Sequence, residues 1–216
     1  GRRNTGKMAA KVDEPAAAAD AAPSWRAPAK RFCMKSILFA AMLALSACAS
    51  GPPAAPVSGI LDTSYTEAGN SRVIQMSMLL AAPPADVYRA LTTLEGWKSW
   101  ATASAFGEVK FGGVMETSYT AAARPGDAAN ISQQFIALVP DRLVAFRTIR
   151  TPEGFPHPDL YMRTVASFLL SPEANGARLL FTHQGFGSEP GFSELYSFFV
   201  EGDRETMENL RKIFGG

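Results

Sequence analysis

His183 and Arg147 are the residues of this chain whose types and predicted positions best suit ligand-binding or acid–base chemistry. His183 lies two residues after Phe181, and side chains two apart on a strand point to the same face of a sheet. By the same rule, Arg147 shares a face with Leu143 on an earlier segment. Because a buried cation needs an acceptor partner, the two side chains together could form a polar floor that binds the carboxylate or hydroxyl of a ligand.

Each of these residues also has a purely structural interpretation. His183 could hydrogen bond to backbone near the end of the sheet, and Arg147 could pair with a carboxylate such as Glu116. The other histidine, His157, stands in "GFPHPD" between two prolines, a composition typical of a loop, and no role is assigned to it. Both interpretations of His183 and Arg147 remain open at this point.

Motifs for several kinds of chemistry are missing from the chain. There is no G-x-S-x-G for a serine nucleophile, no His-x-x-x-His or H-E-x-x-H for a metal, and no G-x-x-x-x-G-K for phosphate. The sequence therefore predicts no catalytic set, no metal and no cofactor, and it favours a binding protein over an enzyme.

Residues 49–216 hold thirteen Lys and Arg against seventeen Asp and Glu. This charge balance argues against a nucleic-acid partner, which needs a clustered basic face.

The two cysteines, Cys33 and Cys48, flank a short apolar segment. Eleven uncharged residues run from position 37 to 47, whereas a membrane-spanning helix needs about 20. Arg31 and Lys35 precede this run and small residues end it, which are the parts of a secretory signal. The segment 34–47 is therefore predicted to direct export.

Leu45-Ser46-Ala47-Cys48 resembles the bacterial lipobox, in which the cysteine thiol is acylated and the chain is cut before it. The resemblance implies lipidation of Cys48 and attachment to a membrane through several acyl chains, which together hold durably. Ala49 stands where an aspartate commonly retains lipoproteins at the inner membrane, so we expect the outer membrane, facing the periplasm. A plain secretory signal with a chance cysteine and a buried helix are the alternatives.

The rest of the chain divides by composition. Residues 1–33 are rich in alanine and poor in large apolar side chains, so they are predicted to be disordered or to be a misassigned upstream segment. Residues 48–70 begin with the lipidated cysteine and continue in Pro, Ala, Gly and Ser, the composition of a flexible tether. Residues 71–216 are predicted to form one folded domain, which contains no cysteine.

The apolar periodicity of this domain predicts an α+β fold. A strand over 72–82 leads into a helix over 84–97, and five alternating runs follow between 114 and 185, separated by turn sequences such as "VPDR" and "SPEANG". The last segment, 193–214, has apolar residues near a 3.6 period and is predicted to be a long amphipathic helix interrupted by Gly202. An antiparallel meander needs an apolar cover on one face, and this helix can provide it.

These segments, in order over about residues 72–214, resemble the START-like (SRPBCC) helix-grip superfamily, in particular its branch named after the activator of the ninety-kilodalton heat-shock protein ATPase. The most specific pieces are "PDRLV" at 140–144 and "NGARLLFTHQGF" at 175–186. The resemblance implies a curved sheet of about six or seven strands wrapped around the C-terminal helix. Many relatives carry Gly-Trp in that helix, whereas Gly202 is followed here by Asp203, which puts in doubt a ligand wall formed by the tryptophan.

The resemblance also implies a cavity between the sheet and the C-terminal helix. Strand alternation aims Phe135, Leu143, Phe168, Leu179 and Phe181 at the helix, with Trp97 and Trp100 near the cavity mouth. These side chains could equally fill a solid core. The expected function is binding of a small hydrophobic or amphipathic ligand by a lipid-anchored envelope protein. A cyclase- or hydratase-type enzyme and a chaperone-interacting module are the alternatives, and no protein partner can be named.

Overall fold

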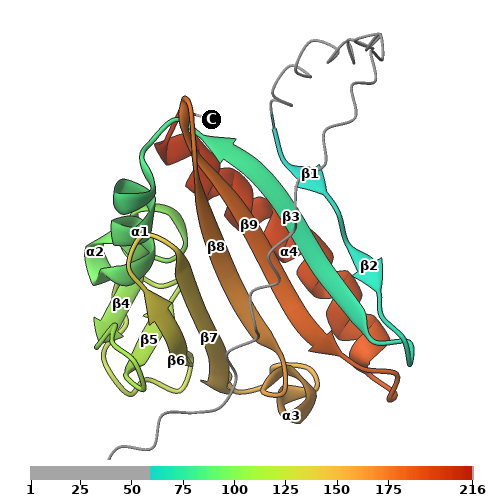
Figure 1. Cartoon of the computed structure of the whole chain (residues 1–216). Coiled ribbons are helices and arrows are strands. Elements are labelled where there is room, and N and C mark those ends of the chain that lie inside the picture. The colour runs from blue at the N-terminus through green and yellow to red at the C-terminus, as the bar shows by residue number, and fades with distance from the viewer. Residues whose placement is uncertain (1–58, 216) are drawn as a thin grey trace, which may run out of the picture. The chain divides into compact units, whose positions relative to one another are not determined.

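The structure is a computed structural model that describes residues 59–215. This region contains nine strands and four helices, whose arrangement can be followed in Figure 1. The strands are β1 (Leu61–Asp62), β2 (Tyr65–Thr66), β3 (Arg72–Leu80), β4 (Ser104–Gly107), β5 (Val114–Ser118), β6 (Ile131–Val139), β7 (Leu143–Arg150), β8 (Val165–Glu173) and β9 (Gly176–Phe186). The helices are α1 (Pro84–Thr92), α2 (Leu94–Trp100), α3 (Pro158–Tyr161) and α4 (Phe192–Ile213).

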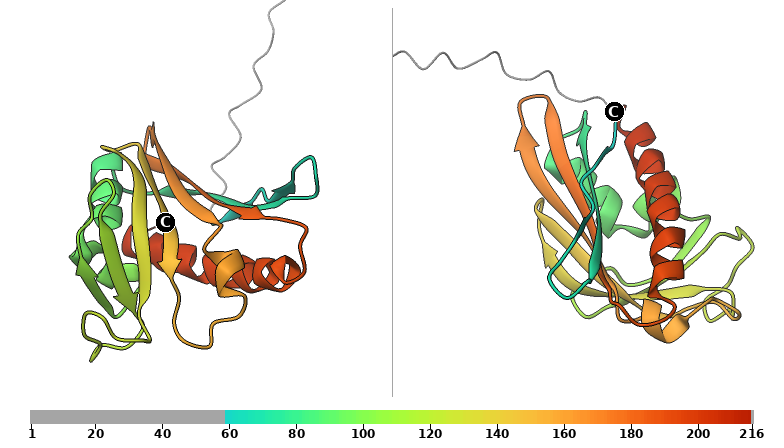
Figure 2. Two further views of the ribbon diagram at one scale, coloured as in Figure 1. Left: turned by 90° about the horizontal axis from the view of Figure 1, so that it is seen from below. Right: turned by 90° about the vertical axis from the view of Figure 1, so that its right-hand side faces the viewer.

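All the strands join one antiparallel sheet in the order β1-β3-β9-β8-β7-β6-β5-β4, with β2 also paired to β3. The strand near the start of the domain, β3, therefore lies beside the last one, β9. The sheet curves, and α4 lies across its inner face (Figures 1 and 2). The predicted α+β helix-grip fold is confirmed.

The sheet has more strands than the six or seven expected, because three short strands were not anticipated. β1 and β2 lie within residues 48–70, which the sequence analysis assigned to a tether, and both pair with β3. β4 pairs with β5 over four residues. Strands of two to four residues are too short to show a recognisable alternation.

The core forms where the inner face of the sheet meets α4. On β3 the side chains of Ile74, Met76, Met78 and Leu80 are buried, in the two-residue alternation that a strand requires. On α4 the buried residues recur at helical spacing: Phe192, Leu195, Phe199, Met207 and Leu210. The helix thus presents one apolar stripe to the sheet.

Two local expectations about the helices are wrong. The segment 84–97 forms two helices, because Thr93 adopts an extended conformation (φ −127°, ψ 150°) and its side chain caps α2 by accepting a hydrogen bond from the Gly96 backbone N–H at 3.0 Å. α4 is continuous through Gly202, which does not interrupt it. The helix keeps its backbone hydrogen bonds there because a single glycine weakens a helix without breaking it.

Candidate functional site

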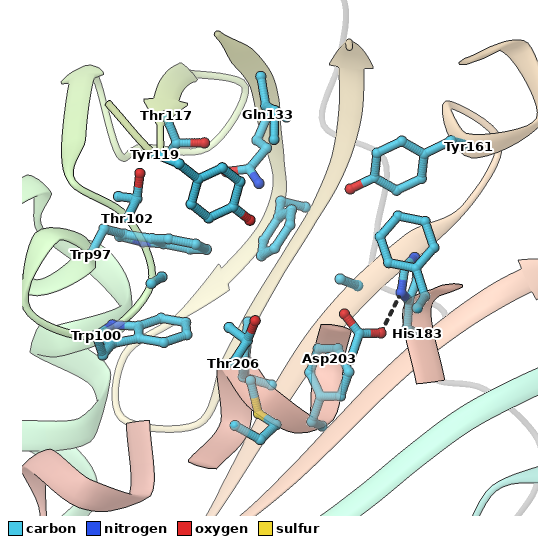
Figure 3. A pocket seen from close by; sticks show the side chains of 18 residues that line it. Trp97, Trp100, Thr102, Thr117, Tyr119, Gln133, Tyr161, His183, Asp203 and Thr206 are labelled. Carbon is cyan, nitrogen blue, oxygen red and sulfur yellow. Dashed lines mark hydrogen bonds and ion pairs between the residues drawn. The ribbon is translucent and has the colours of Figure 1, made fainter. Parts of the chain in front are cut away.

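A cavity of about 110 Å³ lies between the inner face of the sheet, α2 and α4 (Figure 3). Eight aromatic side chains line it: Trp97, Trp100, Tyr119, Phe146, Tyr161, Phe168, Phe181 and Phe199. Its polar lining comes from Thr102, Thr117, Gln133, His183, Asp203 and Thr206. The space therefore has an extensive apolar wall with a small number of polar groups, the usual make-up of a small-molecule pocket.

The two tryptophans of α2 build one side of the cavity. The Trp97 indole N–H donates to the Leu91 carbonyl oxygen at 2.8 Å, and the Trp100 indole N–H donates to the Ala90 carbonyl oxygen at 3.2 Å. Their ring centroids are 5.0 Å apart, and Trp100 packs edge-on against Phe168 at 6.1 Å. Both indole N–H groups therefore donate to backbone carbonyl oxygens of α1. These bonds fix the orientation of the two rings of α2 relative to α1.

A buried histidine–carboxylate pair occupies another side of the cavity. Nδ1 of His183 on β9 lies 2.8 Å from Oδ2 of Asp203 on α4, and Nε2 lies 2.9 Å from the Thr164 hydroxyl. The imidazole is 4% exposed, and the rings of Phe186 and Phe199 stand edge-on to it with centroids 4.7 and 4.8 Å away. Both ring nitrogens are thus hydrogen bonded within the protein, which fixes the imidazole and orients the carboxylate.

Tyr161, at the end of α3, places its hydroxyl on the cavity side, across from Asp203 (Figure 3). Burial raises the pKa of the Tyr161 phenol, and the nearby Asp203 carboxylate adds to the increase, whereas a hydrogen bond with the Thr148 side chain lowers it. The phenol therefore stays protonated at neutral pH and can donate or accept a hydrogen bond.

Five of the residues predicted to bind a ligand line this cavity: Trp97, Trp100, Phe168, Phe181 and His183. Phe135 and Leu179 point to the same side of the sheet, but they are completely buried in the core and do not border the cavity. The structure therefore brings together the aromatic wall and one of the two predicted polar residues.

Leu143 and Arg147 are the predicted site residues that the structure places elsewhere. On β7 the buried side chains Val144, Phe146 and Thr148 face the core, so Leu143 and Arg147 lie on the outer face. A one-residue error in strand parity moves every side chain to the opposite face. The predicted polar floor of His183 and Arg147 does not form.

The structural alternatives for these residues also need correction. Arg147 is exposed and donates to Gln134 Oε1 at 3.0 Å, while the carboxylate of Glu116 is paired with Arg150 at 3.1 Å. His183 is bound by side chains and not by backbone. His157 lies outside the cavity, where its Nε2 is 2.9 Å from Glu194 Oε2.

Asp203 is one of the lining residues that sequence reasoning missed, together with Tyr119, Phe146, Tyr161 and Phe199. The signal was present, because Asp203 occupies the position at which the resemblance expects tryptophan, but no local pattern links it to His183, twenty residues earlier. Where the resemblance expects a tryptophan that would form a ligand wall, this chain therefore has the carboxylate of Asp203, which faces the cavity.

A wider surface groove of about 860 Å³ adjoins the cavity and shares with it Trp100, Ala101, Thr102, Tyr119 and Thr206. Tyr119 is 79% exposed and stands where the two spaces meet. The groove carries charges of both signs, from Lys98, Glu201, Glu205 and Lys212. A ligand larger than the cavity could extend into it.

Some predicted features cannot be placed on this site. Cys48 and the segments 1–33 and 34–47 lie outside the described residues, as does the first half of the predicted tether. Within residues 59–215, no three His, Cys, Asp or Glu side chains are grouped so that they could hold a metal ion. No helix in the described region is both long and apolar enough to span a membrane.

Comparisons with solved structures support the same fold. A protein from Mesorhizobium loti is 20% identical with a TM-score of 0.52, over 65% of this chain and 95% of its own. The Aha1 dimer from Colwellia psychrerythraea is 21% identical with a TM-score of 0.52, over 66% and 95% of the two chains. CalU16 from Micromonospora echinospora is 18% identical with a TM-score of 0.50, over 72% and 83%. At these identities the likeness concerns the fold alone.

Sequence comparison assigns the family. A search of curated protein sequences finds no match. Residues 81–215, more than half of the chain, match the family model described as activator of Hsp90 ATPase homolog 1-like protein. This range contains the residues named above as lining the cavity. The chain therefore belongs to the family of activator of Hsp90 ATPase homolog 1-like proteins.

Proposed function

We propose that this domain binds a small hydrophobic or amphipathic molecule in the cavity between the sheet, α2 and α4. The observation that carries the proposal is the cavity itself, about 110 Å³ of space walled by Trp97, Trp100, Phe168 and Phe181. A core that only had to be stable would be expected to close such a space, because residual cavity volume lowers stability.

The size of the cavity limits what can enter it. An apolar protein cavity of about 150 Å³ can hold one benzene molecule. This cavity is smaller, about 110 Å³, but it opens into the groove, so it suits a short alkyl group or a single small ring that reaches partly into the groove. The rest of a larger ligand would lie in the adjoining groove, past Tyr119. We therefore expect a molecule with a compact apolar end and a more polar remainder.

Filling the cavity should prevent binding. Ala166 on β8 is buried and borders the cavity, so Ala166→Leu adds three carbon atoms to this space. We expect the affinity for toluene, a minimal apolar probe, to fall at least about tenfold. Stability should change by less than about 1 kcal/mol, because the added atoms enter existing space. The indole N–H signals of Trp97 and Trp100 in NMR titrations report the binding.

Ala68→Leu is the matched control, since Ala68 is exposed in the turn before β3 and far along the chain from the cavity residues. It makes the same chemical change and should leave toluene binding as in the wild type. The proposal fails if toluene does not perturb the indole signals of the wild-type protein, or if Ala166→Leu binds it as well as Ala68→Leu does.

We also propose that the domain is held at the bacterial cell envelope by acylation of Cys48, on the periplasmic side of the outer membrane. The support is the sequence Leu45-Ser46-Ala47-Cys48 after a short apolar run. In cells fed radiolabelled palmitate, the wild-type protein should incorporate label and sediment with membranes. Cys48→Ala should lose the label, whereas Cys33→Ala should retain it. Equal labelling of wild type and Cys48→Ala would overturn the anchor.

The alternative of a cyclase- or hydratase-type enzyme rested on His183 and Arg147 sharing one cavity. Arg147 is on the outer face of the sheet, so that particular support is gone. A ligand-binding role needs only the cavity and its lining, and it is the function that the geometry favours.

A further inference from the structure

Asp203 presents a free carboxylate oxygen to the cavity. Its Oδ2 is engaged by Nδ1 of His183 at 2.8 Å. In Figure 3 the second oxygen, Oδ1, points away from His183 and towards the middle of the pocket. Oδ1 has no hydrogen-bond partner among residues 59–215. The side chain is only 16% exposed, so this oxygen is available mainly to whatever enters the cavity.

Two threonine hydroxyls of the lining are also set up to accept hydrogen bonds. The Thr206 hydroxyl donates to the Gly202 carbonyl oxygen at 2.8 Å, and the Thr102 hydroxyl donates to the backbone oxygen of Ser118. Their protons are thus committed, and only lone pairs are left for a ligand.

The net charge of the side chains that line the cavity also favours a ligand with a hydrogen-bond donor. The ionisable residues with a side chain in its lining are Asp203, His183 and the two tyrosines, Tyr119 and Tyr161. With the tyrosines protonated, the net charge is −1 if His183 is neutral and zero if it is protonated, and it is not positive in either state. The faces of aromatic rings attract cations, and eight aromatic side chains belong to the lining.

We infer that the cavity selects a ligand whose polar group is a hydrogen-bond donor, a hydroxyl or a protonated amine, which binds Oδ1 of Asp203 while its apolar ring or chain lies against Trp97 and Trp100. A ligand carboxylate is rejected because it would face the Asp203 carboxylate. This inference rests on the proposed ligand-binding function and reverses the polarity expected from the sequence, which had placed a cationic Arg147 in the site.

Four probes that share one ring test the inference: toluene, benzyl alcohol, benzylammonium and benzoate. In the wild-type protein, benzylammonium should bind about tenfold more tightly than toluene, benzyl alcohol should lie between them, and benzoate should bind more weakly than toluene. This ranking needs no variant, so it does not depend on any substitution being tolerated. Chemical-shift titration of the Trp97 and Trp100 indole signals gives the four dissociation constants.

Asp203→Asn then removes the charge with little change in shape. The advantage of benzylammonium over toluene should shrink from about tenfold to about twofold or less, while toluene itself binds within about twofold of the wild type. Glu201→Gln is the matched control, because Glu201 is an exposed carboxylate on the same helix that borders the groove and not the cavity. It should leave the ranking unchanged.

The possible failures are distinguishable. If no probe binds, the proposed function fails and this inference with it. If toluene binds but benzoate binds as well as benzylammonium, the ligand-binding function stands and the inference is overturned. It is also overturned if benzylammonium keeps its full advantage in Asp203→Asn, or loses it equally in Glu201→Gln.

Discussion

Phe168→Ala is expected to lower the free energy of unfolding by about 3–5 kcal/mol, the usual cost of removing a large aromatic side chain from a core. Phe168 is 2% exposed and lies among aromatic neighbours, with ring centroids 5.2 Å from Phe181, 6.1 Å from Trp100 and 6.2 Å from Phe146. The cost should be high because Phe168 already borders a cavity. The surrounding side chains leave that cavity open, so we do not expect them to move into the additional space that the substitution creates. Guanidinium unfolding followed by circular dichroism measures the change.

Phe111→Ala provides the comparison for this experiment. Phe111 is 76% exposed, so the same chemical change there should cost no more than about 0.5 kcal/mol. Similar losses for the two variants would mean that Phe168 is not packed as described. The Phe168→Ala protein should also bind toluene differently from the wild type, because the substitution widens the cavity that we propose as the ligand site.

Gly176→Ala is the second substitution with a large expected effect, about 3 kcal/mol or more of lost stability. Gly176 opens β9 after the β8–β9 hairpin and has φ +143°, a conformation that residues with a Cβ rarely adopt. An alanine Cβ at this position would overlap the Leu80 carbonyl oxygen at the end of β3. Relief requires backbone movement where β3 and β9 pair, and thermal unfolding should detect it as a lower midpoint.

Asn175→Ala, one residue earlier in the same hairpin, separates backbone strain from a general effect of altering the turn. Asn175 is exposed and is not among the described residues with positive φ, so alanine there should cost less than about 1 kcal/mol. If Gly176→Ala were as stable as Asn175→Ala, the close approach of Gly176 to Leu80 would be wrong.

Much of the fold could be predicted because it is encoded by local patterns. The two-residue alternation of β3 and β9 and the helical spacing of Leu195, Phe199, Met207 and Leu210 are properties of short segments. Turn-forming residue types predicted where one strand ends and the next begins, as in the hairpin at 174–175. The short strands β1 and β2 were not predicted, because they form by pairing with β3. Such pairing is a contact between segments, and it leaves no local pattern in strands of two residues.

The candidate site was predicted in part, because apolar and polar side chains are buried for different physical reasons. Half of the aromatic wall, four of its eight side chains, followed from large apolar side chains on faces that must be buried, as with Phe168 and Phe181. The polar end did not follow, because a polar side chain is buried only when a partner meets it, and partners are set by packing between elements. Arg147 had a plausible partner in Glu116, yet Arg150 pairs with that carboxylate.

The amino-acid sequence by itself determined the class of fold, through periodicity along single segments, and four of the eight aromatic residues around the cavity, while its ordered motifs carried the resemblance to the family. Only the tertiary structure decided which face of β7 is inside and which acid meets His183. A strand's parity depends on its register with neighbouring strands, and the pairing of His183 with Asp203 depends on how α4 lies across β9. Because both are relations between elements distant in the chain, the sign of the charge in the cavity emerged only when those elements were packed together.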